Sequence, residues 1–277
     1  MNLKIKNLFM ILFFTFFLFN CSNKNENLIK PKKVVPLEQL YNQAYQNFEK
    51  GQYREAVSLF EEVEKNYGYT KWGAKALLIK SYIYYDASKY VEALENLKNY
   101  KKLYPGNSEI SYVEYLMAIC LFEQININSR DQTITELSFS QFNKVINTYP
   151  DTVYAEDLKL KLDLVNDQLA GHEMYVARYY QKREKWLAAL KRLTNIINNY
   201  QTTIYIEEAL HRMVEIHYKI GNIEAAKKYA SILGYNYNDS DWFKKTYKIV
   251  VDKNFVENNI NSKKNLREKL KALIKIN

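Results

Sequence analysis

Apolar side chains recur on one helical stripe between residues 53 and 67, at spacings of three and four residues. Such spacings place side chains on one face of a helix. The stripe returns four more times along the chain. The five copies are Tyr53, Ala56, Val57, Phe60, Val63 and Tyr67; Tyr90, Ala93, Leu94, Leu97, Tyr100 and Tyr104; Thr135, Ser138, Phe139, Phe142, Val145 and Tyr149; Trp186, Ala189, Leu190, Leu193, Ile196 and Tyr200; and Ile223, Ala226, Ala230, Leu233 and Tyr237.

Two columns of this alignment have a physical explanation. One holds a small residue in every copy, as expected where two helices approach too closely for a larger group. The other is always Tyr, and most of the residues that follow it, Gly68, Pro105 and Pro150 among them, stop a helix. The small residues are Ala56, Ala93, Ser138, Ala189 and Ala226.

A unit of roughly 34 residues with Ala, Phe and Pro at these offsets is typical of the tetratricopeptide repeat, or TPR. One helical hairpin cannot bury its apolar face alone, so stacked hairpins share a continuous core. Only 7 Gly and 4 Pro among 277 residues leave little material for turns, which suits an all-helical chain. The sequence therefore predicts an all-α fold, a right-handed α-solenoid of about five TPR hairpins.

The solenoid is predicted to span residues 37–243, with a front half (37–150) and a back half (151–243). A polar insertion near 126–133 predicts a loop on one rim of the stack. Residues 154–183 read as one long helical stretch that is interrupted near Gly171. The pattern weakens beyond Trp242 and Phe243. The predicted helices are 37–50, 53–66, 73–85, 89–103, 110–123, 186–200, 207–220 and 223–233, with a short amphipathic helix at 265–276.

The amino terminus reads as an export signal, residues 1–20, with Lys4 and Lys6 before an apolar run too short to span a membrane. Cys21 follows it and resembles the lipid attachment site of bacterial lipoproteins, which predicts a covalent diacylglycerol and an N-acyl chain on Cys21 and no other cofactor. A plain secretory signal is the alternative. Ser22 favours delivery to the outer membrane. Residues 21–36 are then a lipidated, flexible tether.

The net charge of +9 is concentrated at the two ends of the chain. Residues 1–36 carry 6 Lys and one acid, and residues 244–277 carry 10 basic and 3 acidic groups, whereas the solenoid between them is slightly acidic. A nucleic-acid-binding protein would need a basic face on the folded part, so nucleic acid is excluded as a partner. The basic tail, residues 244–277, is either a solvated segment or a contact with anionic lipid headgroups.

The sequence contains no constellation that would support catalysis or hold a metal. Its three histidines, His172, His211 and His217, have no metal-site spacing, and each is expected at a surface or an interface. Cys120 lies in an apolar run and is expected in the core. The protein is therefore predicted not to be an enzyme.

The first helix of each TPR hairpin lines the inner surface of the stack, so its inward positions are the candidate binding residues. In the front half these are mostly aromatic, which suits an extended peptide, although each ring can equally belong to the core between repeats. In the back half they are mostly polar or charged. The predicted peptide groove is Tyr41, Tyr45, Phe48, Tyr82, Tyr85, Tyr112, Tyr115 and Phe122, and the back-half positions are Met174, Arg178, Gln181, Lys182, His211, Glu215, Tyr218 and Lys219.

Residues 21–245 resemble the BamD-type TPR lipoproteins of the outer-membrane β-barrel assembly machine. The atypical residues before Cys21 and Gln201 depart from that family's pattern. The resemblance is carried by Leu169-Ala170-Gly171-His172-Glu173, Val176-Ala177-Arg178-Tyr179-Tyr180, Arg183, Ala188-Ala189 and Arg192, with Arg130-Asp131-Gln132 and Glu208-Ala209-Leu210.

This resemblance implies a lipid-anchored scaffold on the periplasmic side of the outer membrane, without enzymatic activity. It implies binding to the POTRA domains of a BamA-like barrel subunit, with Arg178, Lys182 and Arg192 as the interface, beside other lipoproteins of the machine. It also implies that unfolded outer-membrane proteins present their carboxy-terminal signal to the aromatic groove. The alternatives are a lipid-anchored TPR adaptor of cell-wall remodelling or division, or a soluble periplasmic chaperone.

Overall fold

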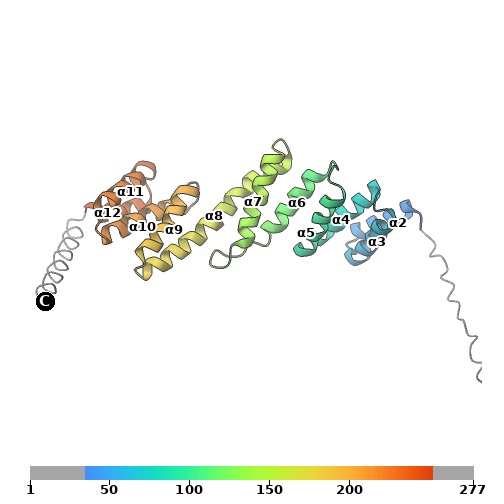
Figure 1. Cartoon of the computed structure of the whole chain (residues 1–277), viewed down its shortest axis with the longest axis horizontal. Helices are drawn as coiled ribbons and strands as arrows, with labels where there is room; N and C mark the ends of the chain where they lie inside the picture. The colour runs from blue at the N-terminus through green and yellow to red at the C-terminus, as the bar shows by residue number, and fades with distance from the viewer. Residues whose placement is uncertain (1–34, 252–277) are drawn as a thin grey trace, which may run out of the picture.

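The computed structural model describes residues 35–251 of the 277-residue chain, and this part is entirely helical. The helices follow one another along the long axis, with α2 at one end and α12 at the other (Figure 1). They are α2 (Leu37–Glu49), α3 (Tyr53–Tyr67), α4 (Lys71–Asp86), α5 (Tyr90–Leu103), α6 (Ile110–Phe122), α7 (Thr133–Thr148), α8 (Val153–Lys182), α9 (Trp186–Asn199), α10 (Ile206–Lys219), α11 (Ile223–Asn236) and α12 (Asp241–Val251).

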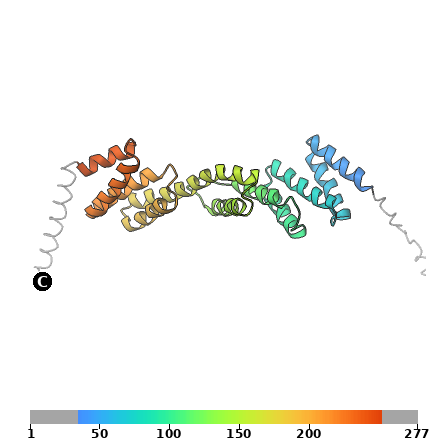
Figure 2. The same ribbon diagram turned by 90° about the horizontal axis from the view of Figure 1, so that it is seen from above.

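Consecutive helices pair as five antiparallel hairpins: α2–α3, α4–α5, α6–α7, α8–α9 and α10–α11. The first helices also contact one another, α2 with α4, α4 with α6, and α6 with α8, so they line one side of the stack. The elongated arrangement persists when the molecule is turned by 90° (Figure 2). The predicted all-α TPR solenoid is confirmed.

The small-residue column lies where the hairpins are tightest. Ala56, Ala93, Ser138, Ala189 and Ala226 are all fully buried. Most core clusters draw residues from neighbouring hairpins; Phe60 of α3, for example, shares a cluster with Leu40 of α2 and Ile83 of α4. Because apolar surface is buried between hairpins as well as within them, the stack is the folding unit and the single hairpin is not.

The tyrosine column marks the end of each second helix. Tyr104 follows α5, and its hydroxyl donates a hydrogen bond to the carbonyl oxygen of Gly68, in the connection between the first and second hairpins. The Tyr67 hydroxyl lies 3.4 Å from the carbonyl oxygen of Val35. A half-buried tyrosine thus lies at the end of the helix, and its hydroxyl contacts a carbonyl oxygen of an earlier segment of the chain.

Helix α4 begins two residues earlier than the pattern indicated. The Thr70 hydroxyl accepts hydrogen bonds from the backbone N–H groups of Trp72 (3.2 Å) and Gly73 (3.3 Å). Such a cap satisfies two donors that the first helical turn leaves unpaired, so the helix starts at Lys71. Gly73 is buried there, and a Cβ on it would lie 2.7 Å from the Gly68 Cα.

The predicted interruption near Gly171 is wrong, because α8 runs unbroken through 30 residues. Gly171 is instead a point of close approach. A Cβ at this position would lie 2.8 Å from the Asn128 side-chain nitrogen and 2.9 Å from the Tyr205 hydroxyl. The α6–α7 loop, which contains the polar insertion, is held against α8 because a His172 ring nitrogen lies 2.8 Å from the Asn128 carbonyl oxygen.

Packed structure also extends past residue 243, where the sequence placed the start of the tail. Helix α12 packs against α10 and α11. Trp242 and Phe243 join one apolar cluster with Leu233, and Ile249 and Val250 join another. Within residues 35–251, α12 thus lies against the last hairpin, in the place that the first helix of a sixth hairpin would occupy.

Several predictions fall outside the described residues. These are the signal peptide, lipidated Cys21, nearly all of the tether, the tail beyond residue 251 and the amphipathic helix at 265–276. Between residues 35 and 251, no helix has the length and apolar character needed to cross a lipid bilayer.

Candidate binding surfaces

Aromatic side chains of α2 and α4 form a continuous series of ring contacts in the front half. The ring centres of Tyr41 and Tyr45 are 6.5 Å apart, and those of Tyr45 and Phe48 are 5.9 Å apart. Phe48 then meets Tyr82 of the next hairpin at 6.1 Å, and Tyr82 meets Tyr85 at 6.0 Å. The structure thus brings together five positions that the repeat register placed on one face.

The series continues on α6. Tyr112 and Tyr115 lie 6.3 Å apart, and both pack on Tyr154 of α8. The Tyr115 hydroxyl donates a hydrogen bond of 2.9 Å to the Asp157 carboxylate. Burial, reinforced by neighbouring Tyr82 and Tyr154, raises the pKa of Tyr112 to about 12. The aromatic row is defined as Tyr41, Tyr45, Phe48, Tyr82, Tyr85, Tyr112 and Tyr115.

Phe122 lies apart from the row. Its ring meets that of Phe142, which is fully buried, at 5.8 Å within the α6–α7 hairpin. Phe122, the last residue of α6, therefore belongs to the core of that hairpin.

Two aromatic residues beside the row were missed by the sequence pattern. Trp72 meets Tyr41 at 4.7 Å and is 37% exposed, and Tyr154 stacks on Tyr115 at 5.0 Å. Both lie in the first turn of a helix, outside the repeated stripe. Tyr45, at 40% exposed, is the most accessible ring of the row itself, whereas its other members are half-buried.

In the back half, a buried carboxylate joins α8 to α10. Glu208 is 5% exposed and accepts hydrogen bonds from Arg178 Nε (2.7 Å) and Arg212 Nε (2.6 Å). A second Arg178 nitrogen binds the other carboxylate oxygen. Burial alone would raise the pKa of Glu208, but the two guanidinium groups outweigh it and hold this pKa below its ordinary value.

The polar network extends from this carboxylate to α12. Arg212 donates to the Gln181 amide oxygen (3.0 Å), and the Gln181 amide nitrogen donates to Glu215 (2.9 Å). His211 lies with one ring nitrogen 3.5 Å from Glu215 and the other 2.7 Å from the Thr246 hydroxyl. Three helices are thus joined by side-chain hydrogen bonds. We call Arg178, Gln181, Glu208, His211, Arg212, Glu215 and Thr246 the polar network.

Three of the back-half positions do not face solvent. Met174 and Tyr218 are core residues, and His211 is 4% exposed. The expectation that His211 is a surface or interface histidine is met only in the second sense, because it lies between α10 and α12. His217 is half-buried and stacks on Tyr229, and burial lowers its pKa.

The exposed side of the polar network forms a basic pocket of about 390 Å³ between α8 and α10. Arg178 and Lys182 come from one helix and Arg212 and Lys219 from the other. The Lys219 ammonium lies 5.1 Å from the centre of the Trp186 ring. The residues that line the basic pocket are Arg178, Gln181, Lys182, Glu184, Trp186, Arg212 and Lys219.

Arg192 does not join Arg178 and Lys182. It lies on α9, and its Nη1 is 3.0 and 3.2 Å from the two carboxylate oxygens of Glu173. Glu173 is five residues before Arg178 on α8, which on a helix turns it well away from Arg178. The three residues proposed as one interface therefore occupy two surfaces.

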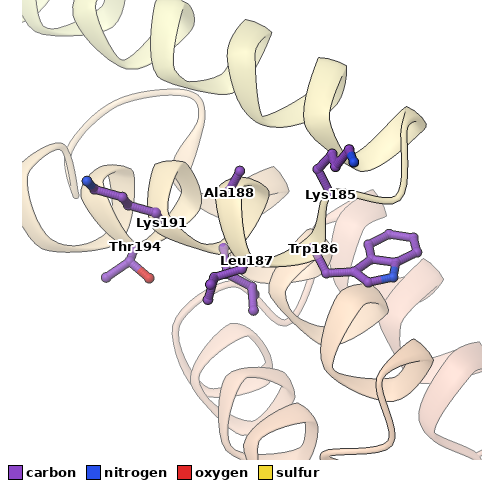
Figure 3. Close-up of a pocket in the computed structure, with 7 residues that line it drawn as sticks. Lys185, Trp186, Leu187, Ala188, Lys191 and Thr194 are labelled. Atoms are coloured by element: carbon purple, nitrogen blue, oxygen red, sulfur yellow. The ribbon is translucent and has the colours of Figure 1, made fainter.

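An open apolar pocket of about 800 Å³ lies along α9, next to Arg192 in sequence. Leu187, at 84% exposed, is its most accessible member. Lys185 and Lys191 stand at opposite ends of the patch, with Leu187 and Ala188 between them (Figure 3). The residues of this α9 pocket are Lys185, Trp186, Leu187, Ala188, Leu190, Lys191 and Thr194.

Cys120 is fully buried, as predicted, and burial raises the pKa of its thiol to about 12, so the thiolate form is suppressed. In the described part of the chain, no three His, Cys, Asp or Glu side chains converge in a way that could hold a metal ion. The surfaces found are suited to binding polypeptides.

Residues 34–233 match the YfiO family model, which describes an outer membrane lipoprotein. The chain is 39% identical to the outer membrane protein assembly factor BamD of Caulobacter vibrioides, over 84% of this chain and 76% of the relative. It is 38% identical to the BamD of Rickettsia prowazekii, over 83% of this chain and 90% of the relative.

Among solved structures, the chain is similar to the TPR domain of P58(IPK), with a TM-score of 0.41 and 12% identity, over 84% of this chain and 66% of that one. It is also similar to TTC0263, a TPR protein of Thermus thermophilus, with a TM-score of 0.35 and 17% identity, over 78% and 98% of the two chains. The family model and the curated relatives show that this chain belongs to the BamD family of outer membrane lipoproteins.

Proposed function

We propose that this protein is an assembly factor for outer membrane proteins, a non-enzymatic scaffold within the β-barrel assembly machine. The observation that carries the proposal is the family match over residues 34–233, which spans the solenoid from before α2 into α11. A TPR stack supports such a role because it presents extended surfaces on rigid helices. It works by holding other polypeptides.

The permanent partner is a BamA-like barrel subunit, which binds through its POTRA domains to the α9 face. Two features support this choice. The α9 pocket is an exposed apolar depression of about 800 Å³, and such patches on soluble domains mark interaction sites. Arg192 lies one helical turn beyond Ala188 on α9, and charged groups near an apolar interface favour specificity over raw affinity.

Charge reversal at Arg192 tests this interface. Arg192→Glu should reduce co-purification of the barrel subunit in a gentle-detergent pull-down from outer membranes, with mass-spectrometric identification of partners. The matched control combines Glu173→Arg with Arg192→Glu, which restores the ion pair between α8 and α9 with its charges exchanged. If the double variant also fails to recover the barrel subunit, the positive charge at position 192 is itself required. An unchanged yield for Arg192→Glu would remove Arg192 from the interface.

Unfolded outer-membrane proteins are the clients, and the aromatic row receives their aromatic carboxy-terminal segment. Rings that are half-buried already have fixed orientations, so little conformational entropy is lost when a client residue packs on them. Trp72 and Tyr154 widen the proposed surface on either side. The aromatic row therefore contributes apolar area and ring edges, and the client contributes an extended strand.

Tyr45→Ala tests the row with the least damage to the fold, because Tyr45 is its most exposed ring. Crosslinking to the last strand of a client should fall several-fold, while helicity measured by circular dichroism stays constant. Tyr235→Ala is the control, since Tyr235 is 89% exposed and lies on α11. Normal crosslinking by Tyr45→Ala together with Tyr82→Ala would contradict a client site on this face.

The anchor is a diacylglycerol and an N-acyl chain on Cys21, placed on the periplasmic side of the outer membrane. Mass spectrometry of the mature amino terminus tests it directly. A Cys21 carrying three acyl chains supports the anchor, and an unmodified amino terminus would make the protein a soluble periplasmic chaperone. Recovery of cell-wall or division proteins in the pull-down, without a barrel subunit, would identify an adaptor of another envelope process.

A further inference from the structure

The basic pocket between α8 and α10 carries an excess of positive charge at its surface. Four of its seven lining residues are cations, and Glu184 is the one carboxylate among them. Two further carboxylates, Glu208 and Glu215, lie behind the lining in the polar network. Since like charges this close repel one another, a pocket of this composition is stabilised by an anion that enters from outside.

The two arginines are held in place before any ligand arrives. Glu208 binds Arg178 through Nε and one terminal nitrogen, and it binds Arg212 through Nε. Gln181 accepts a hydrogen bond from Arg212 Nη1. Each guanidinium keeps at least one N–H group that these contacts do not use, because a guanidinium has five N–H donors. The two arginine side chains are therefore already ordered in the folded protein, so ligand binding loses little side-chain entropy there.

The two lysines supply exposed charges at the rim. Among residues 35–251, neither Lys182 nor Lys219 forms an ion pair with a carboxylate. Lys182 is one turn beyond Arg178 on α8, and Lys219 lies over the Trp186 ring. An ammonium group with three donors can follow a ligand that the fixed guanidinium groups orient.

The size and the flanking groups indicate the ligand. About 390 Å³ holds one side-chain-sized group, and the indole of Trp186 and the amide of Gln181 offer an apolar face and a hydrogen-bonding group for the adjoining backbone. A carboxylate fits the two-oxygen geometry that arginine favours.

We propose that the basic pocket is a carboxylate-binding site for a bound polypeptide, with Lys182 and Lys219 closing on a group that Arg178 and Arg212 orient. The carboxylate comes either from the end of a chain or from an acidic side chain. This site shares Trp186 with the α9 pocket and no residue with the aromatic row, and its test leaves Trp186 unchanged.

Isothermal titration calorimetry on the full-length mature protein in detergent tests the site with ten-residue peptides made of Gly, Ser and Thr. Three peptides are compared: one with a free carboxyl terminus, the same peptide amidated, and an amidated peptide with one internal Glu. The absence of aromatic residues keeps the aromatic row out of the measurement. The variant is Lys182→Gln with Lys219→Gln, both exposed side chains that make no ion pair within the described part.

The free-acid peptide should bind the wild-type protein and lose about tenfold or more in affinity with the double variant, since charge-assisted hydrogen bonds are lost. Lys98→Gln with Lys102→Gln, two exposed residues of α5, should bind as the wild type does. Binding of the internal-Glu peptide would show that a side-chain carboxylate suffices, and its failure would assign the site to chain ends. Equal binding of acid and amide, equal binding by the double variant, or no binding to the wild-type protein would each overturn the proposal.

Discussion

The front and back halves of this solenoid use the same helical hairpin to build surfaces of different chemistry, one aromatic and one charged. In the front half, the first helices meet through rings, with Phe48 on Tyr82 as the link from one hairpin to the next. In the back half, the corresponding link is Glu208 between Arg178 and Arg212. The repeat dictates the position of these residues, and their chemistry is free to vary. One architecture can therefore serve two kinds of partner.

The two halves should therefore respond differently to salt, to pH and to the removal of a side chain. Ring contacts act over short distances and respond little to salt or pH, whereas the polar network depends on the ionisation of buried carboxylates. Removal of one member should therefore cost more in the back half than trimming an exposed ring of the front half.

The largest effect is expected for Glu208→Ala. The change leaves Arg178 and Arg212 without their shared counter-charge, and breaking a buried pair on one side costs about 3 kcal/mol of the free energy of unfolding. Urea denaturation followed by circular dichroism measures this loss. Glu224→Ala, on an exposed residue of α11, is the control and should stay within about 0.5 kcal/mol of the wild type. Similar midpoints for the two variants would refute a structural role for the network.

The next largest effect is expected for Gly73→Ala in the front half. A Cβ there would lie 2.6 Å from the Tyr67 carbonyl oxygen and 2.7 Å from Gly68, both backbone atoms that cannot move aside independently. Overpacking of this kind costs about 2 kcal/mol. Gly106→Ala is the matched control, because its Cβ would meet nothing within 4 Å. Thermal melts that rank the two variants in the reverse order would show that the α3–α4 turn relaxes freely.

Thr246→Val should have a smaller effect, confined to α12. It removes the 2.7 Å partner of His211 while keeping the shape of the side chain, at a cost of about 1 kcal/mol. Hydrogen exchange should accelerate at the amides of α12 and remain unchanged in α3. Tyr247→Ala, on an exposed neighbour, should leave exchange in α12 unaltered; equal acceleration by both would mean that the hydrogen bond does not hold the helix.

The smallest effect is expected on acidification, when buried carboxylates in the two halves should change the free energy of unfolding in opposite directions. The pKa values of Glu208 and Glu215 are lowered: burial opposes this, but hydrogen bonds from Arg178 and Arg212, and from His211 and Gln181, outweigh it. Their stabilisation is present above the ordinary carboxyl pKa of 4.5 and is lost as pH falls through the folded-state values.

Glu64 of α3, which pairs with Lys80 of α4, behaves in the opposite way, because burial raises its pKa despite this lysine. Its protonated form is favoured in the folded state, so its contribution to stability grows as pH falls toward 4.5. Hydrogen exchange from pH 7 to below 4 should therefore show α10 losing protection relative to α3. Parallel changes in both helices would contradict the assignment of these carboxylates.

Much of the fold follows from residues that are close in sequence. The stripe around Phe60 and the small-residue column at Ala56 and Ala93 predicted five stacked hairpins, because periodicity and side-chain volume alone select the packed face. The same register placed Tyr41, Tyr82 and their neighbours on one surface. Helix ends were less accurate where a side chain decided them, as Thr70 does for α4.

Other features required contacts between distant segments. Glycine disfavours the interior of a helix, so the sequence predicted an interruption at Gly171. Only the close approach of Asn128 and Tyr205 explains why glycine lies inside an unbroken helix. The separation of Arg192 from Arg178 depends on which helix each carboxylate partner occupies. The basic pocket likewise exists only because α8 and α10 stand side by side.

The sequence by itself determined the repeat, the class of fold and the chemical character of each half, since all three depend on local spacing and residue type. The tertiary structure decided which charges neutralise one another and which remain available to a partner. Electrostatic pairing depends on distances between atoms that are remote in the chain, and those distances exist only once the hairpins are stacked.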